Sequence, residues 1–319
     1  MTPTPDILGD AAEVLRRWAL DESLKAKTLA NPALANAAAQ IAARYTAGPI
    51  VDNALNLLAT NAGRGHLGSV EYVGESVRET AVANRATAEF VYLADRLKTH
   101  KHDATISFDL SHVGSVISPD LGLLNATQIA QAARESGTYI MISAEGSGRT
   151  DLVLDLYERL SVDFPETGVT LQARLHRTPA DLQRISALPG PVRVVKGAFL
   201  ESESVAYPRN SPDMYEAYQS LVADLVRSGR RVNIATHDDD LVRFIRDDLG
   251  EDLRGEHVEF ETLQGLGTAL LDSLRDESFS TREYVVYGPD WWLYVLNRIA
   301  EHPQRAIVAL ADLNHPDGS

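Results

Sequence analysis

The chain has 319 residues, 44% of them hydrophobic, with a formal net charge of −15 and no cysteine. The acidic charge argues against nucleic acid or an anionic membrane as the main partner, and the lack of cysteine excludes disulfides, thiolate catalysis and cysteine-based metal sites. No stretch approaches the roughly 18 apolar residues of a membrane span, and the N-terminus lacks a signal-peptide pattern. We therefore expect a cytoplasmic protein and leave peripheral membrane contact open.

Residues 1–60 are expected to form a helical segment packed on the rest of the chain. Its alanine-rich runs, such as LANPALANAAAQIAARYTA, place apolar residues at helical spacing and contain few β-branched residues. This segment carries no motif that suggests chemistry.

From residue 61 to 319, short runs rich in β-branched residues alternate with amphipathic stretches. The runs start about 25 to 40 residues apart, the spacing of βα units. They predict one catalytic domain, a distorted (β/α)8 barrel, with an open doubly wound sheet as the alternative. The eight runs are HLGSVEYVGE, ATISFDLSHVG, TYIMISAEGS, GVTLQARL, VRVVKGAF, RVNIATHD, HVEFETLQG and REYVVYG.

The carboxyl ends of these runs are rich in polar side chains, and this is where (β/α)8 barrels place their chemistry. Every run ends with at least one such residue, which favours a functional barrel mouth over a merely solvated one. The residues are Glu71, Glu75, Asp109, Ser143, Glu145, Gln172, Arg174, Arg193, Lys196, Thr236, His237, Glu259 and Tyr284.

The run VRVVKGAF carries two cations, Arg193 and Lys196, followed by Gly197 and Ala198. Two cations beside small residues suit an anionic or phosphorylated ligand. Two alternatives remain, a salt-bridged pair that caps the strand and a Schiff-base role for Lys196. The aspartates 238–240 after His237 favour a helix N-terminus over a metal site, and no metal is expected.

The stretch PDWWLYVLNRIAEHP predicts a helix that ends before Pro303. Helical spacing puts Tyr294, Asn297, Arg298 and Glu301 on one face. The two adjacent tryptophans indicate a well-packed helix, so we expect this polar face to look into the site.

The ordered motifs VEYVGE, SFDLS, ISAEGSGRTDLVLDLYERL, LQARLHR, VRVVKGAF, IATHD, VEFETLQG, EYVVYG and YVLNRIAE resemble the proline dehydrogenase family, over roughly residues 66–302. The resemblance implies non-covalent FAD and oxidation of the C–N bond of a cyclic amino acid to an imine. Gln172 and Arg193 are implied to lie near the isoalloxazine ring. Further cofactor contacts are implied for Lys196, Gly197, Ala198, Thr236 and His237. Substrate contacts are implied for Leu263, Tyr284, Tyr294 and Arg298, from a last helix that lies over the active site.

The departures from the family pattern fall on the substrate side. Asp109 replaces a lysine that binds the proline carboxylate, and Asn297 replaces the first of two paired arginines. Ser143, Arg174 and Phe199 stand where an aspartate and two tyrosines are expected. Because a lost charge-assisted hydrogen bond costs about 1.5–3 kcal/mol, we expect weak binding of proline.

The resemblance, together with these departures, implies an FAD-dependent amine or imino-acid dehydrogenase or oxidase that acts on a substrate other than proline. The candidate catalytic residues are Asp109, Arg193, Tyr284 and Arg298, and Arg174 and Asn297 are added to the substrate site. Asp109 is interpreted as a cation binder or a general base, or alternatively as the structural partner of Arg174. An ordinary L-proline dehydrogenase forming 1-pyrroline-5-carboxylate, a non-redox ligand-binding barrel and a Schiff-base lyase are the other hypotheses. The electron acceptor is left open between quinone, oxygen and a protein.

Overall fold

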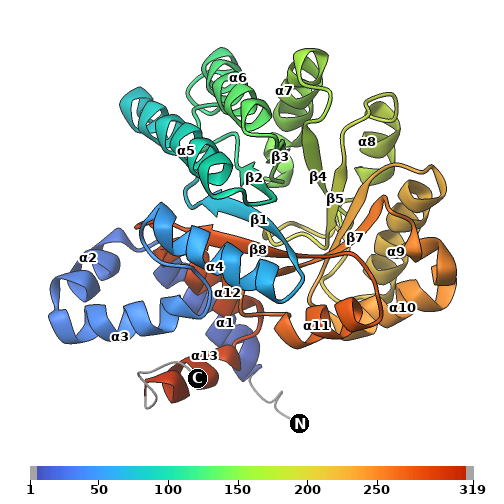
Figure 1. Ribbon diagram of the computed structural model, residues 1–319. Coiled ribbons are helices and arrows are strands. Elements are labelled where there is room, and N and C mark those ends of the chain that lie inside the picture. The colour runs from blue at the N-terminus through green and yellow to red at the C-terminus, as the bar shows by residue number, and fades with distance from the viewer. Residues whose placement is uncertain (1–5, 314–319) are drawn as a thin grey trace, which may run out of the picture.

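Eight parallel strands close into one barrel in the computed structural model, which describes residues 6–313 (Figure 1). The strands pair in chain order, and β8 closes the ring by pairing with β1. Each predicted run contains one strand, so the barrel prediction is confirmed and the open-sheet alternative is wrong. The strands are β1 (Leu67–Tyr72), β2 (Ala104–Phe108), β3 (Ile140–Ile142), β4 (Gly168–Gln172), β5 (Val192–Val195), β6 (Val232–Ala235), β7 (Val258–Leu263) and β8 (Thr281–Tyr287).

Helices cover the outside of the barrel, and several begin at caps that the sequence supplies. Ser118 and Ser211 each accept a hydrogen bond from a backbone N–H of the first turn and precede a proline at the start of the helix. Asp238 caps α10 in the same way, as the run of aspartates predicted. The outer helices are α5 (Thr80–His100), α6 (Pro119–Glu135), α7 (Thr150–Asp163), α8 (Thr178–Arg184), α9 (Pro212–Arg227), α10 (Asp239–Leu249) and α11 (Thr268–Asp276).

The main core fills the layer between the strands and these helices. Large aromatic side chains are fully buried there, and the hydroxyl of Tyr218 on α9 donates to the carbonyl of Val194 on β5. Burying one such side chain contributes about 1.5–3 kcal/mol, so this layer stabilises the barrel. The side chains that point into the barrel are described with the candidate active site below.

The N-terminal segment is helical, as predicted, and its parts pack in two places. It contains α1 (Ile7–Ala19), α2 (Glu22–Ala30), α3 (Pro32–Ala43) and α4 (Val51–Gly63). α4 packs against β1 and β8, and α1 lies along α12 (Trp292–Glu301), where the Trp292 indole donates to the carbonyl of Trp18. The division at residue 60 falls inside α4 and stays a prediction.

A helix that was not predicted follows Pro303. This helix, α13 (Arg305–Asp312), packs against α3 beside the barrel (Figure 1). None of the described helices is long and apolar enough to cross a membrane.

Candidate active site

A cavity of about 760 Å³ opens at the carboxyl ends of the strands, a volume typical of small-molecule sites. Every predicted site residue except Asn297 contributes to its wall. Those residues are Asp109, Gln172, Arg174, Arg193, Lys196, Gly197, Ala198, Thr236, His237, Leu263, Tyr284, Tyr294 and Arg298.

Strand alternation explains how residues far apart in sequence meet in this cavity. Successive side chains of a strand point to opposite faces, so every second residue points into the barrel. β5 thereby contributes Arg193, and β8 contributes Tyr284. The Arg193 guanidinium carbon lies 4.8 Å from the centre of the Tyr284 ring, a cation–π contact that joins opposite parts of the barrel.

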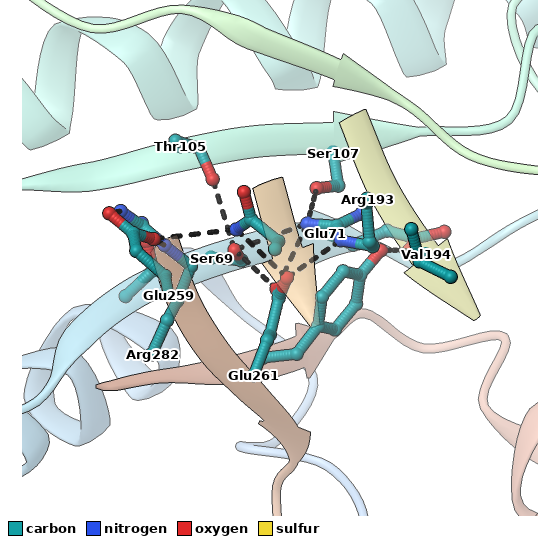
Figure 2. A network of polar contacts seen from close by, with 12 residues as sticks. Ser69, Glu71, Thr105, Ser107, Arg193, Val194, Glu259, Glu261 and Arg282 are labelled. Atoms are coloured by element: carbon teal, nitrogen blue, oxygen red, sulfur yellow. Dashed lines mark hydrogen bonds and ion pairs between the residues drawn. The ribbon is translucent and has the colours of Figure 1, made fainter. Parts of the chain in front are cut away.

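Arg193 is held by Glu261 of β7, as Figure 2 shows. Its Nε and Nη2 donate to the two carboxylate oxygens of Glu261 at 2.8 and 3.0 Å. The hydroxyls of Ser69 and Ser107 accept from the same Nη2 at 3.2 and 3.1 Å. Sequence reasoning missed Glu261, although two glutamates two residues apart in VEFETL were a usable signal.

Four carboxyl groups lie in or close to the wall of the same cavity. Glu71 and Asp109 line its wall, and Glu75 and Glu145 influence their titration from nearby; we call these four residues the acidic cluster. No hydrogen bond or ion pair from any of the described residues reaches the Asp109 carboxyl group. An unpartnered carboxyl that faces a cavity is suited to a cationic group of a ligand.

Burial raises the pKa of Asp109 well above its ordinary value, and the other charges of the acidic cluster raise it further. Burial also raises the pKa of Glu71 to about 7, although a hydrogen bond from Tyr284 and the charge of Arg193 oppose the shift. Arg149 donates to Glu145 at 2.7 Å and partly offsets the negative charge. Glu71 is therefore poised to hold or release a proton near neutral pH.

Arg174 and Asn297 lie differently from what their predicted substrate roles require. The Arg174 guanidinium donates to the carbonyls of Phe199 and Tyr207 at 2.9 and 3.0 Å, so the predicted alternative of an Asp109–Arg174 pair is not formed. Asn297 is partly buried on α12 and does not line the cavity.

α12 contributes Tyr294, Arg298 and Glu301 to the cavity wall, which are spaced one and two helical turns apart. Arg298 pairs with Glu301 at 2.9 Å and lies 5.5 Å from the Tyr294 ring centre. Its Nε is buried without a hydrogen-bond partner among the described residues. This donor is therefore free to bind an acceptor on a ligand.

The residues around β5 and β6 fit the FAD expected from the resemblance. Gly197 has φ +113°, and a Cβ there would come within 2.9 Å of the Arg174 side chain. Glycine is therefore the residue that fits this position. We call Gly197 and the neighbouring side chains of Gln172 and Arg174 the cradle. The buried hydroxyls of Thr170 and Thr262 line the cavity and lack partners in the described chain. Lys196, Arg209 and Arg305 add positive charge, as a pyrophosphate requires.

The density of positive charge in this part of the cavity also lowers the pKa values of basic groups. Burial, together with like charges on Arg16, Arg174 and Arg298, lowers the pKa of Arg209 to about 10, and Glu301 opposes this shift. Burial and the charge of Arg305 lower the pKa of His237 to about 4. An anion bound here would relieve this repulsion.

Lys196 forms an ion pair with Asp238 and lies 4.9 Å from the ring centre of Tyr215. Although burial raises the pKa of Asp238, hydrogen bonds from Lys196 and Tyr215 lower it to about 2. A Schiff-base lysine must have its amino nitrogen free to attack a carbonyl, whereas that of Lys196 is held by Asp238. The geometry thus favours ligand binding for Lys196. Within residues 6–313, no group of three His, Asp or Glu side chains is arranged to hold a metal ion.

A family model described as proline dehydrogenase matches residues 54–294. The chain is 29% identical over 286 residues to proline dehydrogenase 1 of Bacillus subtilis subsp. natto, covering 89% of this chain and 94% of that protein. It is 31% identical over 275 residues to proline dehydrogenase of Deinococcus radiodurans, covering 83% and 87%.

Solved structures share the fold. Proline utilization A (PutA) from Bdellovibrio bacteriovorus, inactivated by N-propargylglycine, superposes with a TM-score of 0.72 at 18% identity over 82% of this chain. A PutA mutant from Bradyrhizobium japonicum gives a TM-score of 0.71 at 21% identity over 85%. The match spans about a third of each PutA chain, 32% in both cases.

Proposed function

Because this chain belongs to the proline dehydrogenase family and is an FAD-dependent oxidoreductase, we propose that it oxidises the C–N bond of a cationic amine or imino acid other than proline. The observation that supports this proposal is the unpartnered carboxyl of Asp109 within the acidic cluster. A substrate nitrogen that carries positive charge would stabilise the ionised form of this carboxyl, whereas a substrate carboxylate would disfavour that form and gain no ion pair from it.

The balance of charges in the cavity argues against tight binding of proline. A proline carboxylate would find Arg298, which already pairs with Glu301 at 2.9 Å. Asp109 and Glu71, whose pKa values burial raises, line the same cavity and offer a carboxylate no positive charge. Each charge-assisted hydrogen bond that is missing costs about 1.5–3 kcal/mol, equivalent to roughly 10- to 150-fold in affinity.

FAD, when bound, would accept the hydride, with its two electrons, that leaves the carbon attached to the substrate nitrogen as the C–N bond becomes C=N. We propose that Gln172 and Arg193 contact the isoalloxazine ring. Lys196–Ala198, Thr236 and His237 would bind the rest of the cofactor. Asp109 binds the substrate nitrogen and takes the proton that it loses on forming the imine, a role suited to a carboxyl with a raised pKa. Tyr284 and Leu263 shape the pocket, and α12 limits the access of water through Tyr294 and Arg298.

An anaerobic reduction experiment tests this proposal. Purified holoprotein is mixed with L-proline and with a panel of cyclic amines, diamines and N-alkyl amino acids, and the loss of flavin absorbance is followed. We expect rapid bleaching by a substrate with a cationic nitrogen and little by proline. Rapid bleaching by proline at modest concentration would overturn the proposal.

The alternative, L-proline oxidation to 1-pyrroline-5-carboxylate, has one observation in its favour, because the relatives at 29% and 31% identity are proline dehydrogenases. The same panel decides between the two. Reoxidation of the reduced protein by a soluble quinone analogue, by oxygen or by neither then identifies the class of electron acceptor.

A further inference from the structure

The barrel interior holds two ion pairs between strand residues. Arg193 of β5 pairs with Glu261 of β7, and Arg282 of β8 pairs with Glu259 of β7 (Figure 2). The amide of Asn233 donates to both glutamates, at 3.1 Å to Glu261 and 3.4 Å to Glu259. Interiors of (β/α)8 barrels are usually filled with branched apolar residues, so charged pairs here call for a physical reason.

Only one of these pairs reaches the cavity. Arg193 and Glu261 belong to its wall, and Glu259 and Arg282 do not. The side chains of Arg193 and Glu261 are only 4% and 2% exposed. Removing one member of such a pair would leave an uncompensated buried charge, so the two side chains act as a unit.

The hydrogen bonds of Arg193 fix the rotation of its guanidinium. Glu261 occupies the edge formed by Nε and Nη2, and Ser69 and Ser107 share Nη2. No acceptor among the described residues reaches Nη1. Glu261 is itself held by the hydroxyl of Ser69 at 2.7 Å and by Asn233. These hydrogen bonds thus leave the Nη1 edge of the Arg193 guanidinium for a ligand.

We propose that Glu261 is a positioning residue for FAD. It presents the Nη1 edge of Arg193 to the isoalloxazine ring and offsets the positive charge that Arg193 brings there, which lowers the reduction potential of the bound flavin. This inference rests on the proposed placement of Arg193 at the flavin and does not depend on the substrate. Its physical basis is that a cation stabilises the reduced, more negative flavin, whereas a closely paired cation and anion do so much less.

The test measures the reduction potential of the holoprotein in a chemical titration against a redox dye, together with the Kd for FAD. In Glu261→Gln the charge of Arg193 is no longer offset, so binding of reduced over oxidised FAD should rise about tenfold, which is about 30 mV for a two-electron couple. Arg193→Gln should shift the potential downward. Glu259→Gln is the matched control, since it removes a paired glutamate from the same strand away from the cavity, and should change the ratio by less than about threefold.

The double variant Arg193→Gln with Glu261→Gln leaves neither charge, and its potential should return close to that of the unmodified protein. It also covers the case in which Glu261→Gln fails to fold, because it leaves no unpaired buried charge. A double variant shifted as far as Arg193→Gln alone would overturn the inference, as would equal shifts in Glu261→Gln and Glu259→Gln. If Arg193→Gln leaves the potential unchanged, the placement of Arg193 at the flavin is the part that fails.

Discussion

The hydroxyl of Tyr284 on β8 donates a hydrogen bond to the carboxylate of Glu71 on β1, where these two strands close the barrel. The bond is buried beside Arg193, whose guanidinium lies over the Tyr284 ring. Hydrogen bonding and Arg193 both favour the charged form of Glu71, yet burial prevails and raises its pKa to about 7. The hydrogen bond that links β8 to β1 therefore involves a carboxyl group that gains or loses a proton near neutral pH.

This coupling predicts how stability depends on pH. Between its ordinary pKa of 4.5 and about 7, Glu71 holds a proton in the folded protein that the unfolded chain has lost. The contribution of Glu71 to the free energy of unfolding should therefore fall as pH rises through this window, by up to about 1.4 kcal/mol per pH unit. The fall should level off above about pH 7. Urea unfolding at pH 5 to 8 measures it.

Glu71→Gln removes the titrating group and should flatten this slope. Glu166→Gln is the control, because hydrogen bonds from Arg134 lower the pKa of Glu166 and keep it ionised throughout the window. A difference in the free energy of unfolding between the unmodified protein and Glu71→Gln that stays constant from pH 5 to 7 would contradict the account of Glu71.

Asp109→Lys combined with Asn297→Arg should confer activity on proline. The change replaces a negative charge by a positive one in the cavity wall, where a lysine can pair with the remaining acidic cluster and meet a carboxylate. We expect KM for proline to fall roughly 10- to 100-fold, the value of one charge-assisted hydrogen bond. Asp109→Lys alone should give most of the effect, since Asn297 lies off the cavity wall.

The control for Asp109→Lys is Asp95→Lys, which makes the same change in net charge on the exposed side of α5. It should leave KM for proline unchanged. If the double variant binds FAD normally and gains no affinity for proline, the assignment of specificity to Asp109 is wrong.

The fold could be predicted because each βα unit has a recognisable pattern in a short stretch of sequence. A short β-branched run followed by an amphipathic stretch needs no long-range information, and the carboxyl-end rule then gathers Asp109, Arg193 and Tyr284 from three strands. The cap at Asp238 was equally local, since an aspartate before a helix serves its first turn.

The missed parts depend on geometry that the sequence does not contain. The pairing of Arg193 with Glu261 follows from which inward residues of β5 and β7 face each other across the closed barrel. On α12, Tyr294, Arg298 and Glu301 line the cavity and Asn297 does not. The sequence places all four on one face, and the rotation of the helix about its own axis decides which of them reach the cavity. Arg305 was missed because no helix was expected beyond Pro303.

Lys196→Met should weaken FAD binding. The ammonium group lies in the cavity wall between Asp238 and the ring of Tyr215, and the flexible methionine keeps most of the apolar stem. Loss of one charge-assisted contact to a phosphate should raise the Kd for FAD by about 10- to 100-fold. Lys98→Met on the exposed surface of α5 is the control. Equal Kd values for the two variants, measured by fluorescence titration, would remove Lys196 from the cofactor site.

Gly197→Ala should reduce FAD binding more than it reduces stability. At φ +113° an added Cβ is strained, at a cost of roughly 1–3 kcal/mol, and it would press on Arg174 at 2.9 Å and on the amide oxygen of Gln172 at 3.1 Å. Gly137→Ala is a matched control, because Gly137 also has a positive φ, +81°, but has open space around its Cβ position. Both variants should lose comparable stability in thermal unfolding without FAD. Only Gly197→Ala should lose affinity for FAD, by at least about tenfold, because only there does the new methyl displace residues of the cradle. Equal loss of affinity in both variants, or none in either, would show that the cradle at Gly197 does not support the cofactor.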